Sequence, residues 1–116
     1  MGMKTVAIIG ALDEEVALIA KSLTHVTHTA KGSLDIVSGT VDSFGSDVIK
    51  VAATVGGMGL VNAAATTQLL IDEIAPDAVI FSGIAGNLNT HLHINDVVLG
   101  GTLRYLDTRH AARRPV

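Results

Sequence analysis

Three glycine-rich turns are the parts of this sequence best suited to hold a ligand. They are Gly10-Ala11, Gly56-Gly57-Met58-Gly59 and Gly83-Ile84-Ala85-Gly86, and each follows an apolar run that predicts a buried strand. Ligands of open α/β sheets collect where strands end, because glycine lets the backbone approach a ligand and a helix start offers free N–H groups. The sequence therefore predicts a small-molecule site at these strand ends.

Glu15 is a carboxylate just beyond the first strand end, in the first turn of a predicted helix. Two roles remain open for it on the residues alone. Together with Asp13 and Glu14 it can stabilise the positive end of the helix dipole. Alternatively, it can serve as a general acid or base at the mouth of the sheet. Asp13 and Glu14 lie on other helical faces, so we expect them to face solvent.

The second turn partly matches a dinucleotide-binding fingerprint, but its third glycine is missing and no acidic residue ends a following strand at the right distance. A tight turn without a ligand is the simpler interpretation. His91 and His93 have the spacing of two ligands on one strand face, but no further ligands accompany them, and we expect a surface loop. His25 and His28 are expected on opposite faces of a strand, so the sequence predicts no metal site.

The elements that must position these residues follow from the hydrophobic periodicity. The pattern predicts strands over 4–10, 25–30, 34–41, 47–55, 77–82 and 94–100, and helices over 13–23 and 60–74. Apolar residues run nearly all round the second helix, so we expect both of its sides to be covered. This order of elements predicts an α/β domain with a mixed central sheet flanked by helices.

Composition narrows the class of protein. The 116 residues suffice for one domain, 48% of them are hydrophobic, and the net charge is only −3. No basic stripe with interleaved aromatic residues is present, so we expect no nucleic-acid partner. The absence of cysteine excludes disulfides and thiolate chemistry. The apolar run Thr5–Leu12 lacks a cleavage site and nothing is long enough to span a membrane, so we expect a cytoplasmic protein.

Four stretches, in order, resemble the bacterial 5′-methylthioadenosine/S-adenosylhomocysteine nucleosidases of the nucleoside phosphorylase superfamily. They are 6–16, 55–64, 82–86 followed by 94–98, and 104–107. Together they cover residues 4–108, which resemble the N-terminal half of a nucleosidase domain, and the basic tail 109–116 diverges. The resemblance implies a phosphorylase/nucleosidase-like α/β fold and, by family, a homodimer.

The resemblance also implies roles for individual residues. Glu15 matches the glutamate that positions and activates the attacking water, and Met58 matches the apolar residue near the ribose and its 5′ substituent. Ala11 is implied as substrate-binding, and Ile84-Ala85-Gly86 match the turn that lines the base and the water pocket. The implied reaction hydrolyses the N-glycosidic bond of a purine nucleoside to adenine and a 5′-thio-substituted ribose, without metal or organic cofactor. The first turn lacks the arginine of phosphate-using members, which favours water as the nucleophile.

The sequence departs from the family in one important respect. The family's second half supplies a Ser-Asp pair that protonates the purine and a Met-Glu pair that grips the ribose hydroxyls. No Met-Glu pair occurs here, and Ser46-Asp47 lies before a strand in another region. We therefore expect an incomplete site and negligible adenine release from this chain alone. The alternatives are an inactive nucleoside-binding or dimerising module, and a fragment of a purine nucleoside phosphorylase or futalosine-type hydrolase.

Overall fold

A computed structural model describes residues 3–42 and 47–104 of the chain. The chain divides into two compact units, Met1–Ala85 and Gly86–Val116, which are called here the N-terminal and C-terminal units. The last predicted family stretch, 104–107, and the basic tail lie largely or wholly outside the described residues. In the described residues, every helix and strand belongs to the N-terminal unit, and none of these helices is long and apolar enough to cross a membrane.

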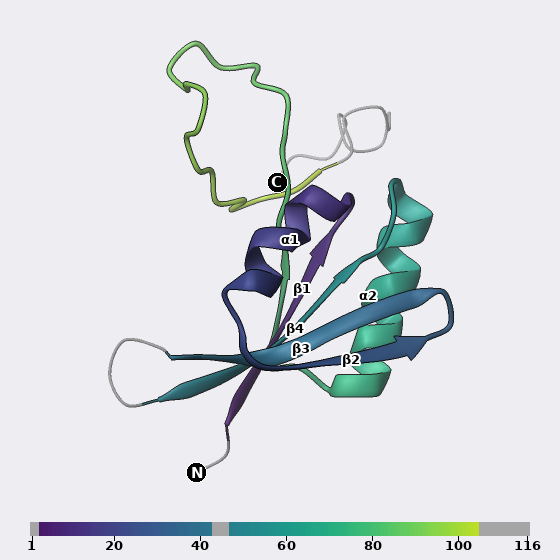
Figure 1. Ribbon diagram of the computed structural model, residues 1–116. Coiled ribbons are helices and arrows are strands. Elements are labelled where there is room, and N and C mark those ends of the chain that lie inside the picture. Colours follow the sequence, from purple (N-terminus) through teal and green to yellow (C-terminus); the bar gives the residue numbers. More distant parts are fainter. Residues whose placement is uncertain (1–2, 43–46, 105–116) are drawn as a thin grey trace. The chain divides into compact units, whose positions relative to one another are not determined.

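The N-terminal unit is built around a five-stranded sheet in the order β2-β3-β4-β1-β5 (Figure 1). Strand β1 pairs in parallel with β4 and β5, whereas β3 pairs antiparallel with both β4 and β2. This arrangement confirms the predicted mixed α/β sheet. The elements are β1 Lys4–Gly10, α1 Asp13–Lys21, β2 Thr24–Lys31, β3 Leu34–Asp42, β4 Val48–Val55, α2 Leu60–Ile74 and β5 Ala78–Phe81.

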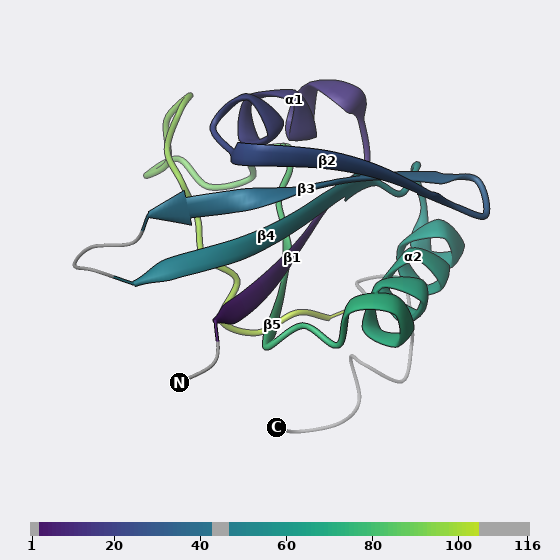
Figure 2. The ribbon, with the colours of Figure 1, turned by 60° about the horizontal axis from the view of Figure 1, so that its bottom comes forward.

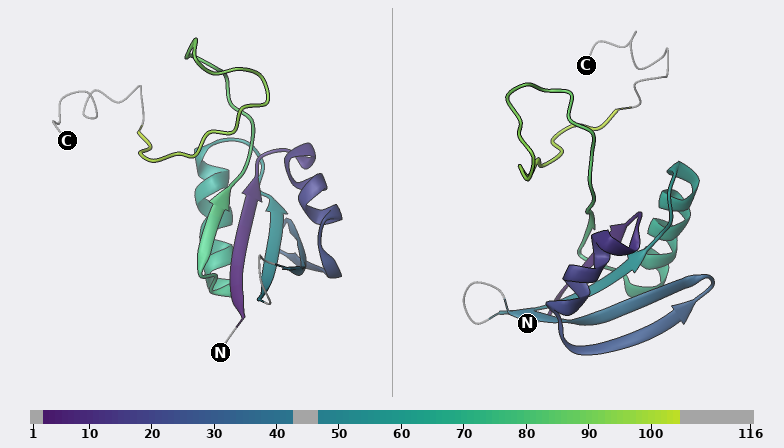
Figure 3. Two further views of the ribbon diagram at one scale, coloured as in Figure 1. Left: turned by 90° about the vertical axis from the view of Figure 1, so that its left-hand side faces the viewer. Right: turned by 45° about the horizontal axis from the view of Figure 1, so that its top comes forward.

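The register of the parallel strands brings their carboxyl ends to one edge of the sheet. Gly10 at the end of β1 lies opposite Val55 at the end of β4, and Ile9 lies opposite Phe81 at the end of β5. The three strands run in the same direction side by side (Figure 3). The turns that follow them therefore leave the sheet at the same edge.

The sheet is covered on both faces, by α1 on one side and α2 on the other (Figure 2). Consecutive strand residues point to opposite faces, and Ala52 and Ala53 in β4 are both fully buried. The main core cluster contains two alanines and two isoleucines of the sheet and one leucine of α2, which pack closely because interiors leave few voids. Its members are Ala7, Ile9, Ile36, Ala52 and Leu70.

The expectation that α2 is covered on both sides is wrong for the described residues. Leu70 and Thr66 are buried against the sheet, but the side chains of Leu60 and Val61 are 68% and 82% exposed. Apolar residues all round a helix predict full burial only where a second layer exists. Here the sheet supplies one layer, and none of the described helices and strands of the N-terminal unit covers the outer face.

Helix α2 ends where the sequence predicts. Ala75 adopts the left-handed conformation, with φ 48° and ψ 59°, and its N–H donates to the carbonyl of Ile71 at 3.0 Å. This is a common way for a helix to end, although glycine usually occupies the left-handed position. Pro76 follows directly and cannot continue the helix.

The strand predicted over 94–100 is wrong. None of the described residues of the C-terminal unit forms a strand, and Asn95 has a positive φ of 75°. A turn forms there instead, in which the N–H of Asp96 donates to the carbonyl of His93 at 3.1 Å. A β-branched run becomes a strand only when a neighbouring strand accepts its hydrogen bonds. Asparagine tolerates the left-handed region, so the turn is the local alternative.

Candidate functional site

Backbone hydrogen bonds join the glycine turns at the carboxyl edge of the sheet. The N–H of Gly56 donates to the carbonyl of Gly10 at 2.9 Å, which ties the turn after β4 to the turn after β1. The N–H of Ser82 donates to the carbonyl of Ile9, also at 2.9 Å, and ties the turn after β5 to β1. Within the N-terminal unit, the strand ends at which the sequence predicts a small-molecule site therefore lie side by side.

The carboxylate of Glu15 spans the first and third turns. Its Oε2 accepts hydrogen bonds from the N–H of Ala11 at 2.6 Å and the N–H of Leu12 at 3.1 Å. Its Oε1 accepts one from the N–H of Ile84 at 3.3 Å. The structure thus brings together three of the residues singled out from the sequence: Ala11, Glu15 and Ile84.

The local fold explains why Glu15 points back toward the strand end. Helix α1 begins after Leu12, and Glu15 is its third residue, so its side chain reaches back to the N–H of Leu12. This is one half of a capping box, whose other half Leu12 cannot supply because leucine has no side-chain acceptor. Glu15 therefore stabilises the start of α1, which was one of the two roles that the sequence allowed. The same hydrogen bond holds its carboxylate at the edge of the sheet.

Two glycines leave room for this carboxylate. A Cβ added at Gly83 would lie 3.0 Å from Oε1 and 3.1 Å from Cδ of Glu15. A Cβ added at Gly10 would lie 2.7 Å from Cγ2 of Val16 and 3.1 Å from Cβ of Glu15. Gly10 therefore allows a close approach that a Cβ would block, whereas at Gly83 a Cβ would press on the end of the flexible Glu15 side chain. The third turn can reach the Glu15 carboxylate because Gly83 has no side chain.

The three N–H donors hold the pKa of Glu15 below its usual value, with Leu12 contributing most, then Ala11, and Ile84 least. Desolvation opposes them and raises the pKa, but by less than the two larger hydrogen bonds lower it. Glu15 is therefore ionised at neutral pH and acts as an acceptor. An ionised carboxylate has about four lone-pair sites, so three bonds leave one on Oε1, beside the third turn.

Met58, in the second turn, is an apolar candidate for contact with a ligand. Met58 lies between Gly57 and Gly59, which have φ of 83° and 95°, and its side chain is 70% exposed. In the third turn, Ile84 is 85% exposed and Ala85 is exposed as well. Gly86 is the first residue of the C-terminal unit, which is described by itself. The exposed apolar candidates in the N-terminal unit are therefore Met58, Ile84 and Ala85.

Asn62 is a residue whose role sequence reasoning missed. Its Nδ2 donates to the carbonyl of Met58 at 2.7 Å, across the second turn. Residues 55–64 match the imperfect fingerprint and the family resemblance, but neither pattern indicates a role for Asn62. An amide side chain in the first turn of a helix, directly after glycines, is the signal that could have found it.

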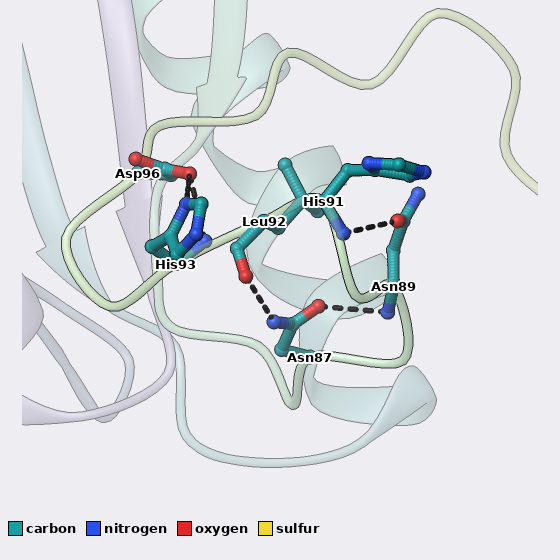
Figure 4. A network of polar contacts seen from close by, with 6 residues as sticks. All are labelled: Asn87, Asn89, His91, Leu92, His93 and Asp96. Atoms are coloured by element: carbon teal, nitrogen blue, oxygen red, sulfur yellow. Dashed lines mark hydrogen bonds and ion pairs between the residues drawn. The ribbon is translucent and has the colours of Figure 1, made fainter.

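The histidine pairs do not form a joint site. His91 and His93 lie in turns, where the N–H of His91 donates to Asn89 Oδ1 and the N–H of His93 donates to Asp96 Oδ2, both at 2.8 Å (Figure 4). The side chain of His93 also lies 3.6 Å from Asp96, from Nδ1 to Oδ2. This agrees with the expected surface loop. The strand alternation assumed for His25 and His28 is wrong, because His25 has φ 53° at a register shift in β2.

A pocket of about 470 Å³ lies between α1 and the β3–β4 part of the sheet, and its lining reaches Asp13 and Val55, which flank the first and second turns. Its walls include Val16 and Ala20 of α1, Val37 of β3 and Ala53 of β4. Glu15, Met58 and Ile84 are not among the residues that line it. The pocket therefore borders the first and second turns without including the side chains of these three residues.

Comparisons with known proteins give a consistent result. The family described as the phosphorylase superfamily matches residues 5–115. The chain is 38% identical to a 5′-methylthioadenosine/S-adenosylhomocysteine nucleosidase of Anoxybacillus flavithermus, over 81% of this chain and 38% of that protein. It is 35% identical to the nucleosidase of the same name from Halalkalibacterium halodurans, over 90% of this chain and 43% of that protein. The chain therefore spans about two fifths of the length of these relatives.

Solved structures agree with the sequence relatives. The structure of a nucleosidase of this type from Colwellia psychrerythraea, in complex with adenine, superposes with a TM-score of 0.74 at 30% identity, over 82% of this chain and 37% of that chain. The corresponding enzyme from Neisseria meningitidis, in complex with methylthio-immucillin-A, gives a TM-score of 0.67 at 33% identity, over 78% of this chain and 37% of that chain.

Proposed function

This chain belongs to the phosphorylase superfamily, and from that premise we propose that it supplies the water-positioning part of a purine-nucleoside N-ribohydrolase site. The substrate class is a 5′-thio-substituted adenosine, such as 5′-methylthioadenosine or S-adenosylhomocysteine. The relatives with these names, and the adenine and methylthio-immucillin-A bound to two of their structures, support this choice. Because the chain spans about two fifths of these relatives, the whole reaction remains part of the proposal.

The observation that carries the proposal is the Glu15 carboxylate shared between the turns after β1 and β5. In glycosidic hydrolysis the bond from C1′ of the ribose to the purine nitrogen breaks, and its electron pair leaves with the base. Water then forms the new bond to C1′ and loses a proton, while the departing purine nitrogen gains one, so that the products are neutral adenine and a ribose hydroxyl. The free lone pair of Oε1 is suited to accept a hydrogen bond from that water and orient its oxygen.

A carboxylate with a lowered pKa is a weak base, which suits this reaction better than it suits proton abstraction from carbon. The ribose is already cationic in an oxocarbenium-like transition state, so the water needs orientation more than prior deprotonation. The negative charge of Glu15 also favours a developing positive charge nearby. The proposal assigns the ribose and its 5′ substituent to the exposed Met58, and the base and water to Ala11 and Ile84-Ala85-Gly86.

The residues that would protonate the purine and grip the ribose hydroxyls are not identified in this sequence. No Met-Glu pair occurs in it, and Asp47 precedes β4 at the end of the sheet away from the glycine turns. We therefore propose that the 116-residue chain binds a 5′-thioadenosine but releases adenine at a negligible rate. Losing a general acid alone costs about a hundredfold or more in rate. A homodimer and a cytoplasmic location, both expected from the sequence, belong to the same proposal.

The test uses the chain as it is. Isothermal titration with 5′-methylthioadenosine should show saturable binding by the wild-type chain. The variant Glu15→Gln, which keeps the shape of the side chain but removes its charge, should bind a cationic transition-state analogue such as methylthio-immucillin-A at least about tenfold more weakly. Glu14→Gln is the matched control, since Glu14 lies in the same helical turn but is exposed. It should change the affinity by less than about twofold.

A chromatographic assay of released adenine distinguishes an incomplete site from a complete nucleosidase. Saturable binding with negligible release favours the incomplete site. Robust release would instead establish a complete nucleosidase. If the wild-type chain binds neither ligand, the nucleoside proposal is refuted. Sedimentation of the same samples tests the expected dimer.

A further inference from the structure

Within the part of the chain that the structure describes, the side-chain hydrogen bond across the turn between β4 and α2 comes from Asn62. This residue is the third of α2, and its Nδ2 donates to the carbonyl of Met58 at 2.7 Å. The bond crosses the turn from the first helical turn back to the residue before the N-cap, Gly59. Gly59 itself has no side chain and makes no capping hydrogen bond. Among the described residues, Asn62 is the one whose side chain forms a hydrogen bond with the Met58 backbone.

The direction of this hydrogen bond is unusual. A polar side chain at the third helical position commonly accepts a hydrogen bond from the N-cap backbone, as Glu15 does in α1. Asn62 donates instead, and its partner is a carbonyl rather than an N–H. A carboxylate in its place would turn an acceptor toward that carbonyl. The hydrogen bond to the Met58 carbonyl therefore depends on the amide donor, and a carboxylate of the same size does not replace it.

The backbone of this turn needs such a restraint. Gly57 and Gly59 have positive φ angles of 83° and 95°, in regions that glycine enters and leaves easily. A Cβ added at Gly57 would lie 3.1 Å from Asn62 Nδ2, so the amide lies directly against the turn. The other end of the turn is tied to the Glu15 side of the site by the bond from Gly56 N–H to the Gly10 carbonyl. Between these two fixed points lies Met58.

We propose that Asn62 is a positioning residue, which fixes the Met58 backbone so that the Met58 side chain stands beside the ribose and 5′ substituent of the bound nucleoside. This inference rests on the proposed function, because it assumes that a nucleoside occupies the edge. Asn62 acts through Met58 and needs no contact with the ligand. Its substitution should therefore affect the part of the ligand near Met58 and spare the base.

The isosteric change Asn62→Asp separates positioning from folding. It replaces the donor with an acceptor that repels the Met58 carbonyl, and it keeps the volume of the side chain. At the same time α2 has no acidic residue in its first turn, so a carboxylate there interacts favourably with the helix dipole. In this variant the favourable interaction with the helix dipole therefore offsets part of the stability lost with the hydrogen bond to Met58. Asn62→Ala removes the bond without adding repulsion.

Gln68→Glu is the matched control, because it makes the same amide-to-carboxylate change on the same helix. Gln68 is exposed and its Nε2 donates to Asp72 Oδ1 at 3.1 Å, two helical turns beyond Asn62. Isothermal titration of each variant uses two probes, 5′-methylthioadenosine and free adenine. Adenine has no ribose or 5′ substituent, so it reports on the base pocket alone.

We expect Asn62→Asp to weaken 5′-methylthioadenosine binding about tenfold and Asn62→Ala by a smaller factor. Both should bind adenine like the wild type, and Gln68→Glu should bind both probes like the wild type. Unchanged 5′-methylthioadenosine affinity in Asn62→Asp would overturn the inference while leaving the proposed function intact. Equal weakening for both probes would also overturn it, in favour of a general structural effect. A wild-type chain that binds neither probe would refute the proposed function, and this inference with it.

Discussion

The carboxylate of Glu15 accepts a hydrogen bond from the backbone N–H of Ile84, a residue 69 positions later in the chain, at 3.3 Å. The same carboxylate caps the start of α1 through Leu12. One side chain therefore stabilises a local helix end and a long-range junction between two strand ends. Its charge and its distance from Gly83 lead to the first two of four predictions, and the other two concern the end of α2 and the core.

The first prediction concerns acid stability. The folded-state pKa of Glu15 lies below its ordinary value, because its ionised form receives three N–H donors. The unfolded chain therefore binds a proton more readily than the folded one as the pH falls. The stabilisation is fully present above the unfolded pKa of about 4.3 and is lost as the pH drops through the lower folded value. Urea unfolding between pH 3 and pH 7 should show this loss.

The variant Glu15→Gln should lack that component of the acid dependence, and Glu14→Gln should retain it. Identical pH profiles for wild type and Glu15→Gln would show that the hydrogen bonds to Ala11, Leu12 and Ile84 do not distinguish the charged from the neutral side chain.

The second prediction concerns the space left by Gly83. In Gly83→Ala the new Cβ would lie 3.0 Å from Glu15 Oε1, and the end of this flexible side chain can move away. The fold should survive, with a loss of about 1 kcal/mol or less. The Ile84 N–H bond should weaken, so the pKa of Glu15 should rise toward its usual value. Carboxyl ¹³C NMR titration measures it.

Gly101→Ala serves as the control for this experiment, because a Cβ at Gly101 meets nothing within 4 Å. It should leave the titration of Glu15 unchanged. A normal Glu15 titration in Gly83→Ala, identical to that of the wild type, would contradict the close approach seen here.

The third prediction concerns the end of α2. Ala75 has φ 48°, a left-handed conformation that costs a residue with a Cβ about 1–2 kcal/mol. Ala75→Gly removes this cost but gives the unfolded chain more freedom, worth about 0.4–1 kcal/mol. The free energy of unfolding should therefore rise by roughly 0.5 kcal/mol, measured by urea denaturation.

The same substitution at Ala65, an exposed residue in the middle of this helix, should have the opposite effect on the free energy of unfolding. Ala65→Gly should destabilise the protein by about 1 kcal/mol, since helical φ and ψ suit alanine better than glycine. Equal effects of the two substitutions would contradict a left-handed conformation at Ala75.

The fourth prediction concerns the core below the site. Leu70 is fully buried against Ala7, Ile9 and Ala52, so Leu70→Ala should cost about 2–5 kcal/mol and leave a cavity. That is a large share of the stability of a domain of this size. Leu18→Ala is the control, because Leu18 is 72% exposed and should cost less than about 0.5 kcal/mol. Thermal unfolding followed by circular dichroism compares the two, and similar losses would mean that Leu70 is not a core residue.

The sequence by itself determined the elements with strong local patterns. The strand over Lys4–Gly10 and the helix over Leu60–Ile74 have the predicted bounds, because apolar periodicity, glycine and proline act over a few residues. The mixed sheet and the family resemblance followed from the order of these elements and the glycine turns between them. The position of Glu15 beside a strand end was also readable, since it depends on a short turn.

Only the tertiary structure decided how distant residues meet. Glu15 caps α1 through Leu12 and also accepts a hydrogen bond from Ile84, because strand pairing between β1 and β5 brings the third turn to it. Its role as a general acid or base stays a prediction. The predicted strand over 94–100 failed for the same reason, since a strand depends on a partner that local sequence does not specify. The donor role of Asn62 depended on backbone angles at Gly57 and Gly59, which the residue types permit without determining.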